Sequence, residues 1–461
     1  MADLAYGIGA YKSLVTGLPE LRVLNCYAEA SPMQGVLPEL VARPALTAPQ
    51  LLGDAPIRGV YQWDGVLGGR ALVFGSRVFV DGVDIGAAPG AGLVRAAAGE
   101  GEVIAVMGGG LYRIDGAAVT PVAFPDDAPV ADVDFLKGRF LAVRGDTGAF
   151  YWSDILDGTN WDGLAFATAE RQADPLVAVR VVGDEVYLFG TETVEVWVSG
   201  PDPDLAFQPI DGRVFSKGCA GRDTIARLDN TVWWVSPEGV VYRAGPAVPE
   251  RVSTHSIEEQ IAGAAPDDLS AWAFSWRGHA FYALRIANVA TYLHDAATGE
   301  WCEWKSYGAD DWLAHCGQNV DAAVLTGSHA SPVVWRLSDA TSRDQAPDAD
   351  SIEIVREFTA LLPTRRPMSV VSLEVSAAVG RAPLSVEPLL EMRFSRDGGF
   401  TWSNRYKAAL GRQGHYRTRT RWLRLGQADA PGMVFEFRLT DEAPWRVSSV
   451  RVNESIGGRA R

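Results

Sequence analysis

A short phrase recurs seven times between residues 78 and 338: a run of aromatic and β-branched residues that closes on Asp, Ser, Ala or Thr, usually followed by Gly. Successive copies start 33 to 51 residues apart, close to the roughly 40 to 50 residues of a β-propeller blade. The copies occupy residues 78–82, 111–116, 150–154, 194–200, 240–245, 291–299 and 333–338. Because one blade cannot bury its own faces, the repeat predicts blades stacked into a ring.

A second apolar run ending in a turn precedes several copies, so each repeat holds at least two neighbouring strands. These runs are residues 71–76, 103–110, 140–146 and 186–191. Seven copies favour seven blades, and six or eight stay open because ring closure often borrows a strand from the other terminus. We expect the propeller to occupy residues 55–340, interrupted by a short helix over residues 253–262, where Ile257 and Ile261 share one face.

The remaining chain reads as three further segments. Residues 1–54 are rich in proline and predict an extended, irregular N-terminal arm. Residues 341–351 are polar without apolar periodicity and predict an interdomain linker. Alternation then returns, so we expect a β-sandwich over residues 352–461 and an all-β fold overall. The alternating runs are residues 352–358, 370–376, 389–395, 421–426 and 434–440.

The charge of the chain is strongly acidic and unevenly spread. The net charge is −15, which argues against general affinity for nucleic acid. Residues 401–461 carry +7 and residues 1–400 carry −22, so the two parts suit complementary faces in an assembly or separate folding units. A solvated basic face is the alternative.

The sequence predicts neither a targeting signal nor disulfide bonds. The N-terminus lacks the basic start and apolar run of a secretory signal, and no apolar stretch of about 20 residues is present to span a membrane. Four widely spaced cysteines read as reduced, buried side chains. We expect the protein to fold in a cytoplasm, without contact with a membrane.

Catalytic and cofactor motifs are missing from the sequence. It has no H-E-x-x-H, no P-loop and no G-x-S-x-G. His315 and Cys316 are the nearest approach to a metal pair, but adjacent strand residues face opposite sides. We therefore expect no catalytic, metal or cofactor site, and no enzymatic activity.

One hairpin motif leaves a second function open. Ser395, Asp397, Gly399 and Trp402 fit the Asp-box pattern S-x-D-x-G-x-x-W that sialidases carry on hairpins. Its mechanics are local, since the Asp accepts backbone donors in the turn and the Gly takes a positive φ. The structural interpretation is favoured, and a glycan-binding or glycan-cleaving propeller is the alternative.

The basic stretch of residues 406–425 is the best candidate for an interaction surface. Arg417, Arg419 and Arg421 alternate with threonines, so in a strand all three would face one side, flanked by Tyr416 and Trp422. Such a row suits an acidic partner. A solvent-facing edge kept soluble by its charge is the equal alternative.

An ordered set of phrases resembles the packaged-DNA stabilisation family, the tail hub or nozzle proteins of short-tailed phages. It begins with L-N-C-Y-A-E (residues 24–29) and A-R-P-A-L (residues 42–46), where Ala45 replaces the usual Gly. It continues through R-G-V-Y, F-Y-W-S-D-I-L-D-G-T-N-W-D, F-G-T-E-T-V-E-V-W, K-G-C-A-G and R-V-S-T-H-S-I-E, at residues 58–61, 150–162, 189–197, 217–221 and 251–258. The resemblance covers most of residues 20–310 and is looser in the C-terminal domain.

The resemblance implies a structural virion protein in the phage tail. Six copies would form a ring below the portal and its adaptor, retain the packaged DNA, and carry the tail needle, tail fibres or spikes, or both. The acidic body fits a channel that lets the genome slide without binding it. Our candidates for acidic residues lining that channel are Asp81, Asp84, Asp154 and Asp157.

Overall fold

The computed structural model describes residues 2–6, 21–30, 38–169, 174–201, 206–321 and 323–453. The chain divides into two compact units. The blade unit comprises Pro49–Ala287 and Leu313–Arg336, and the sandwich unit comprises Met1–Ala48, Asn288–Trp312 and Leu337–Arg461. None of the helices in the described ranges has the length and hydropathy needed to cross a membrane.

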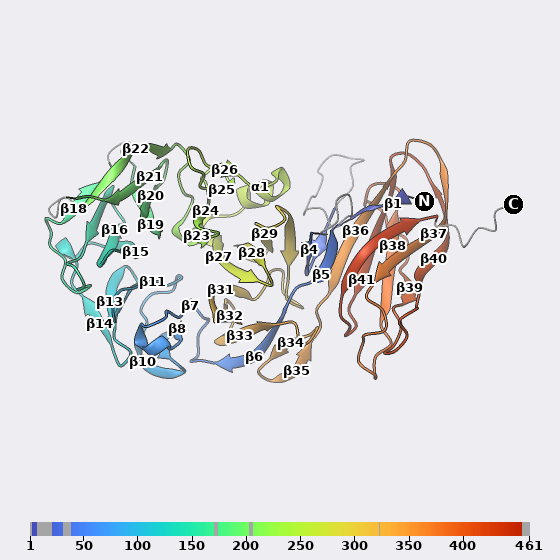
Figure 1. Cartoon of the computed structure of the whole chain (residues 1–461), viewed down its shortest axis with the longest axis horizontal. Helices are drawn as coiled ribbons and strands as arrows, with labels where there is room; N and C mark the ends of the chain where they lie inside the picture. Colours follow the sequence, from blue (N-terminus) through green and yellow to red (C-terminus); the bar gives the residue numbers. More distant parts are fainter. Residues whose placement is uncertain are drawn as a thin grey trace. The chain divides into compact units, whose positions relative to one another are not determined.

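The blade unit is built from antiparallel four-stranded sheets that follow one another along the chain (Figure 1). The first sheet consists of β7 (Gly59–Tyr61), β8 (Leu72–Phe74), β9 (Arg77–Val80) and β10 (Val83–Ala87), and the second of β11 (Arg95–Ala98), β12 (Val103–Met107), β13 (Gly110–Ile114) and β14 (Val119–Val122). The third consists of β15 (Val130–Leu136), β16 (Arg139–Arg144), β17 (Ala149–Trp152) and β18 (Phe166–Thr168), and the fourth of β19 (Leu176–Val182), β20 (Glu185–Gly190), β21 (Val194–Ser199) and β22 (Phe207–Phe215). The fifth consists of β23 (Ala226–Leu228), β24 (Thr231–Val235), β25 (Val241–Arg243) and β26 (Glu250–Arg251).

Two further sets of strands complete the series. β27 (Leu269–Trp276) pairs with β28 (His279–Ile286) in the blade unit, and β29 (Ala290–Asp295) pairs with β30 (Trp301–Trp304) in the sandwich unit. The last sheet has the order β31 (Ala314–Val320), β32 (Ala323–Ser328), β33 (Val333–Ser338) and β6 (Ala45–Leu51). In chain order the described strands thus fill seven blade positions, as the repeat count favoured.

The recurring phrase marks one particular strand of each blade position. It falls on the third strand every time, and the apolar run before it falls on the second. The third strands are β9, β13, β17, β21, β25, β29 and β33. The predicted helix is present as α1 (His255–Ala262), with Ile257 and Ile261 buried.

The ring of the blade unit closes between its first and last sheets. The innermost strand β31 contacts β7, and β27 contacts β31 in turn. An apolar cluster spans the junction, with Leu52, Ile57 and Phe79 on one side and Cys316 and Val334 on the other. The amide of Leu52 also donates to the Pro332 carbonyl at 2.8 Å. A strand from the N-terminal side therefore completes the last sheet.

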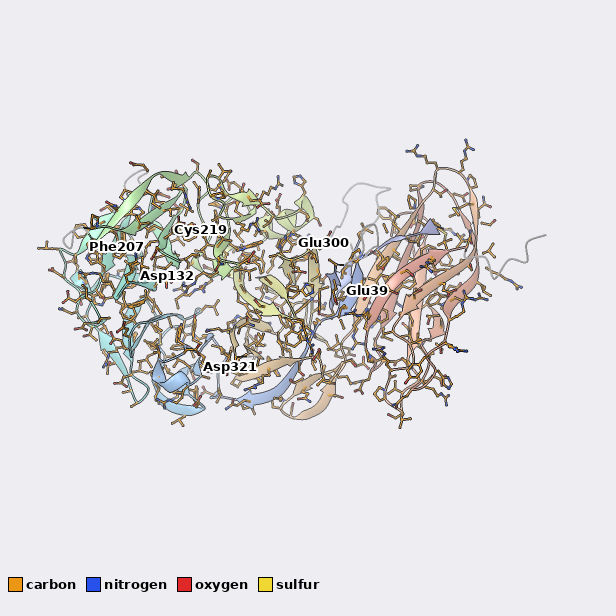
Figure 2. The ribbon with its side chains drawn as sticks, in the orientation of Figure 1. Glu39, Asp132, Phe207, Cys219, Glu300 and Asp321 are labelled. Atoms are coloured by element: carbon orange, nitrogen blue, oxygen red, sulfur yellow. The ribbon has the colours of Figure 1, made fainter. Side chains whose placement is uncertain are left out.

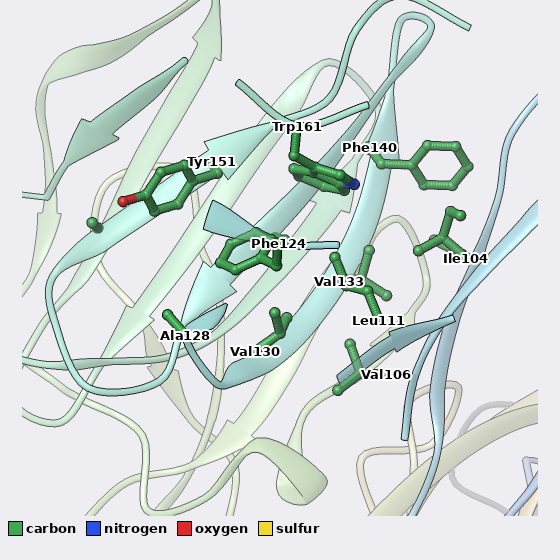
Figure 3. Packing of buried hydrophobic residues seen from close by; sticks show 13 residues of the cluster. Ile104, Val106, Leu111, Phe124, Ala128, Val130, Val133, Phe140, Tyr151 and Trp161 are labelled. Atoms are coloured by element: carbon green, nitrogen blue, oxygen red, sulfur yellow. The ribbon is translucent and has the colours of Figure 1, made fainter. Parts of the chain in front are cut away.

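Neighbouring blades are held together by apolar side chains from both sheets. Between the second and third sheets, Ile104, Val106 and Leu111 pack with aromatic residues of the next blade (Figure 3). The ring of Phe124 meets Tyr151 and Trp161 edge-on, with centroids 5.1 and 5.5 Å apart. Edge-to-face contacts add stabilisation beyond burial alone. The prediction that blade faces are buried only by stacking is confirmed here.

The sandwich unit contains two large sheets. One has the order β4 (Cys26–Glu29), β5 (Glu39–Ala42), β42 (Arg446–Val452), β37 (Met368–Ala377) and β40 (Thr420–Ala428), with β1 (Ala2–Asp3) also pairing with β42. The other runs from β30 through β3 (Val23–Leu24), β36 (Arg356–Pro363), β41 (Gly432–Leu439) and β38 (Leu389–Ser395) to β39 (Tyr406–Ala409), with β2 (Ala5–Tyr6) on β36. Buried Trp422 of β40 packs on Phe437 of β41 at 5.7 Å, which joins the two sheets.

Two segments differ from the irregular structure that we expected. The described part of residues 1–54 forms strands β1 to β6, because its backbone pairs with strands far along the chain, such as Val23 with Phe358. Other parts of the predicted arm, residues 7–20 and 31–37, lie outside the described residues. The segment predicted as a linker contains a hairpin of β34 (Asp344–Ala346) and β35 (Ala349–Ile352), so the alternating run at 352–358 is divided between β35 and β36.

Arg43 connects distant segments of the sandwich unit. Its guanidinium is buried and donates to the carboxylate of Asp344 at 2.6 and 3.0 Å. It also donates to the side-chain oxygen of Asn25 at 2.8 Å, and that oxygen accepts from the Lys305 amide at 2.8 Å. Asp344 further accepts from the amide of Leu46 at 2.8 Å. One arginine therefore orders the β5–β6 connection, the β34 hairpin and the chain after β30.

We predict that Arg43→Met lowers the free energy of unfolding by about 3–5 kcal/mol, because it leaves the buried Asp344 carboxylate without its partner. Urea denaturation followed by tryptophan fluorescence measures the change. The control is Arg412→Met, which removes an exposed ion pair with Glu387 and should cost less than about 1 kcal/mol. Equal losses in the two variants would contradict the central role of Arg43.

Candidate interaction surfaces

The three arginines proposed as one basic row do not share a strand. Arg417 lies in a turn and Arg419 precedes β40, so only Arg421 is a strand residue. The pairing of β40 with β37 ends at Thr420 opposite Val375, and among the described residues no strand is paired with residues 417–419. The expected alternation of the three side chains on one face is therefore wrong.

The side chains of this stretch also differ in solvent exposure and in their interaction partners. Arg419 forms an ion pair with Glu374, its Nε donating at 2.9 Å. Arg417 and Tyr416 are exposed. Trp422, which we expected to flank the row, is buried and donates its indole N–H to the Tyr406 carbonyl at 3.1 Å. The exposed part of the basic surface is thus centred on the turn at Tyr416 and Arg417.

Two acidic candidates, Asp81 and Asp84, lie at the outer edge of the first blade. Asp81 occupies the turn between β9 and β10 and accepts from the Ala71 amide at 2.9 Å. Asp84 lies in β10, the last strand of its sheet, and forms an ion pair with Arg77. That pair holds the pKa of the Asp84 carboxyl below its usual value.

The other two acidic candidates stabilise the loop after β17. Asp154 accepts from the side chain of Asn160 at 2.5 Å. Asp157 accepts from the backbone and hydroxyl of Thr159 at 2.9 and 2.6 Å, which lowers the pKa of its carboxyl. Gly158 is required here because a Cβ would lie 2.6 Å from Cγ1 of Ile104 in the neighbouring blade. The turn chemistry that the sequence suggested for these aspartates is present.

The same loop exposes apolar side chains that the sequence analysis did not single out. Ile155, Leu156 and Leu164 are 63%, 52% and 85% exposed. Phe166, at the start of β18, is also exposed and stacks on Tyr151 with centroids 5.4 Å apart. The sequence does carry a signal for this surface, namely apolar residues placed among the aspartates and glycines of a predicted loop. An apolar surface on a loop anchored by Gly158 can take part in contact between proteins.

The Asp-box residues form a compact turn between β38 and β39 of the sandwich unit. Ser395 is buried, donates its hydroxyl to Asp397 at 2.6 Å and accepts from the Gly399 amide at 2.8 Å. Asp397 accepts from the Thr401 amide at 2.9 Å, and Gly399 has a φ of +106°. The indole of Trp402 lies under the guanidinium of Arg393 at 4.5 Å. Each motif residue has a local structural role.

The cysteines and histidines give no sign of a metal site in the described residues. All four cysteines are free and buried, as expected; Cys219 is labelled in Figure 2. His315 and Cys316 both reach the Ile57 carbonyl, at 2.7 and 3.9 Å, because a register irregularity in β31 alters the strict alternation of sides. In the described ranges, no group of three or more His, Cys, Asp and Glu side chains could hold a metal ion.

Comparison with protein families gives matches along most of the chain. The family model described as the β-propeller of bacteriophage P22 Gp10 matches residues 23–342. The model described as the β-sandwich of the same protein matches residues 355–455. No curated protein matches the sequence.

Solved structures with similar folds share little sequence with the chain. BamB from Moraxella catarrhalis is 12% identical, covering 64% of this chain and 99% of its own, with a TM-score of 0.41. The BBS1N protein in complex with ARL6DN is 9% identical, covering 64% and 97%, with a TM-score of 0.45. PorZ from Porphyromonas gingivalis is 10% identical, covering 78% and 46%, with a TM-score of 0.40. At these scores the likenesses carry no argument about function.

We predict that Asp397 stabilises the β38–β39 turn in a pH-dependent way. Hydrogen bonds from Ser395 and Thr401 hold the pKa of this carboxyl far below its usual value. A depressed pKa gives stability that is complete above the unfolded value of about 3.9 and is lost as the pH falls toward the folded value. Asp397→Asn should therefore lower the thermal midpoint more at pH 7 than at pH 3. The exposed control Asp429→Asn should show no such difference, and a pH-independent effect of Asp397→Asn would refute the prediction.

Proposed function

Because the chain belongs to the bacteriophage P22 Gp10 family of phage stabilisation proteins, we propose that six copies form a ring that extends the DNA channel of the tail. Membership makes the chain a structural tail protein of the virion that stabilises packaged DNA, and not an enzyme. The observation that carries the proposal is the match of both domains, propeller and sandwich, in the family order.

The partners that we propose are those of a ring at this position. The ring would dock on the head-to-tail adaptor below the portal and would carry the tail needle, a tail fibre or spike, or both. The basic C-terminal region, net +7 over residues 401–461, suits an acidic neighbour. The body of the chain, net −22 over residues 1–400, supplies such acidic surface on a second copy.

Charge also supports a channel that conducts DNA without binding it. Six copies carry a net charge of about −90, so the ring as a whole gains little from displacing counterions on the duplex. Retention of the genome would then be mechanical, through constricting loops together with the needle or plug that the ring holds. Asp81, Asp84, Asp154 and Asp157 remain our candidates for the channel lining; Asp84 contributes least, since Arg77 already offsets its charge.

We predict that phage particles assembled without this protein package DNA and then lose it. Electron microscopy of such particles should show emptied heads and tails truncated below the adaptor. A complementing copy of the gene should restore filled heads. Particles that keep their DNA, or that carry a complete tail, would refute the proposed function.

The turn at Arg417 offers a test of assembly that leaves the fold unchanged. Arg417→Glu should weaken association by about tenfold, because a negative charge would then oppose an acidic neighbour. Arg365→Glu, which reverses another exposed charge of the sandwich unit, is the matched control. Analytical ultracentrifugation of the purified protein, with and without adaptor, measures the change. Equal assembly of both variants at physiological salt would exclude Arg417 from the contact.

A further inference from the structure

A cavity with an unusual charge lies among the innermost strands of the blade unit. Its volume is about 360 Å³, within the range of small-molecule sites. Residues of the innermost strands β7, β11, β19, β23, β27 and β31 line it. Four of the lining residues are arginines, namely Arg58, Arg95, Arg180 and Arg227, and none of the lining residues is Asp or Glu. An acidic chain has thus gathered positive charge at the axis of its ring.

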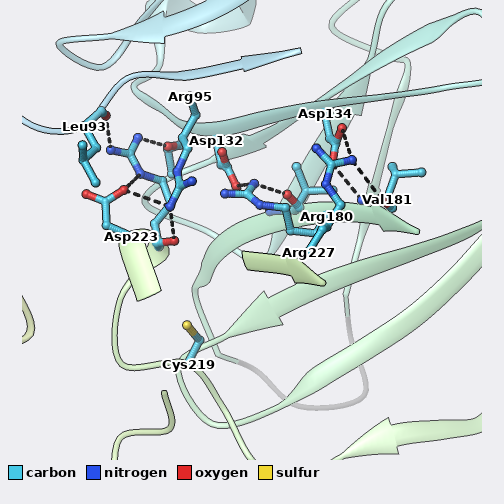
Figure 4. A network of polar contacts seen from close by, with 12 residues as sticks. Leu93, Arg95, Asp132, Asp134, Arg180, Val181, Cys219, Asp223 and Arg227 are labelled. Carbon is cyan, nitrogen blue, oxygen red and sulfur yellow. Dashed lines mark hydrogen bonds and ion pairs between the residues drawn. The ribbon is translucent and has the colours of Figure 1, made fainter. Parts of the chain in front are cut away.

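The aspartates near these arginines also accept hydrogen bonds from the backbone of a neighbouring blade. Asp132 accepts from the Val179 amide at 3.1 Å, and Asp134 accepts from the Val181 amide at 2.7 Å (Figure 4). Each also pairs with one arginine, Asp132 with Arg180 and Asp134 with Arg227. These carboxylates therefore connect β15 to β19 and β23 while the arginines remain on the cavity side.

The positive charge exceeds the negative charge of the cluster. Asp223 is shared by Arg95 at 3.3 Å and Arg222 at 3.1 Å. The guanidinium of Arg58 donates to backbone carbonyls, including Gly92 at 2.7 Å and Ala88 at 2.9 Å, and within the described residues it has no carboxylate partner. Five arginines thus face three aspartates.

Two guanidinium donors of this cluster are buried without a hydrogen-bond partner, as is Oδ1 of Asp132. The side chain of Arg180 is only 6% exposed, and its Nη2 has no hydrogen-bond partner; Nε of Arg95 also lacks one. Burial and the neighbouring Arg95 and Arg227 lower the pKa of Arg180, although the Asp132 carboxylate opposes this effect. Burial and Arg222 likewise lower the pKa of Arg58. The arginines that line the cavity therefore keep a surplus of positive charge over the three aspartates, and a bound anion would neutralise that surplus.

We propose that this cavity binds a small phosphate-type oxyanion between the arginines of the innermost strands. Guanidinium groups match the oxygens of phosphate in geometry and charge. The cavity is too small for a DNA duplex, so the anion is either free phosphate or the phosphate group of a small molecule. Bound there, it links strands of several blades and stabilises the closed ring.

Isothermal titration calorimetry and thermal unfolding of the purified chain test the proposal. Inorganic phosphate should bind and should raise the thermal midpoint relative to chloride at equal ionic strength. Adenosine monophosphate, titrated in parallel, distinguishes the sources: phosphate binding identifies the free ion as sufficient, and binding of the nucleotide alone identifies a phosphate group on a larger ligand. Binding of neither would overturn the proposal.

Variants connect the binding to the cavity. Arg95→Gln removes a lining cation while Asp223 keeps Arg222 as its partner, so the fold should persist and affinity should fall about tenfold. Arg227→Gln, with a half-exposed side chain, is the second variant if the first does not fold. Arg77→Gln removes an arginine of an exposed aspartate pair outside the cavity and should bind as the unaltered protein does. Equal affinity in the cavity variants and the control would place the anion elsewhere.

Discussion

The blade unit depends on burial of the faces that each four-stranded sheet cannot cover by itself. The cluster between the second and third sheets shows how this is done, with aliphatic side chains such as Ile104 packed together with Phe124 and with Trp161 of the next blade. Such an arrangement leaves two open faces until the first and last sheets meet. The cluster of Leu52, Ile57 and Cys316 covers those two faces, so the closed ring is stabilised by the same hydrophobic burial as the contacts between blades.

In the sandwich unit, a buried polar contact between Asn25 and Arg43 joins separate segments of the chain. The family phrases L-N-C-Y-A-E and A-R-P-A-L meet through Asn25 and Arg43, whose side chains are joined at 2.8 Å. Asn25 has a φ of +54°, which Asn tolerates better than most residues, and its amide group donates to the Val355 carbonyl at 2.7 Å. Ala45, which stands where the family has Gly, begins a strand and does not have a positive φ. The phrases are recognisable because they form one buried junction.

The blades could be predicted because their signal is local. A run such as Leu111 to Gly116 contains both its strand and its turn. Strands β1 to β5 could not be predicted, since their pairing partners lie far along the chain and no local alternation marks them. The prediction of one strand from Arg417 to Arg421 was wrong because an alternating sequence forms a strand only where a partner strand pairs with it, and the pairing with β37 stops at Thr420. The arginines of the cavity come from different blades, so no spacing in the sequence brings them together.

Ring closure through a strand from the N-terminal side imposes an order on biosynthesis. Leu52 leaves the ribosome early, yet its contacts at Pro332 and Val334 are made by residues that follow roughly 280 positions later. At the usual rate of translation this interval lasts on the order of tens of seconds. During that time each finished blade presents an uncovered apolar face at the growing end of the array. The contacts that close the ring can therefore form only after the last sheet has been synthesised.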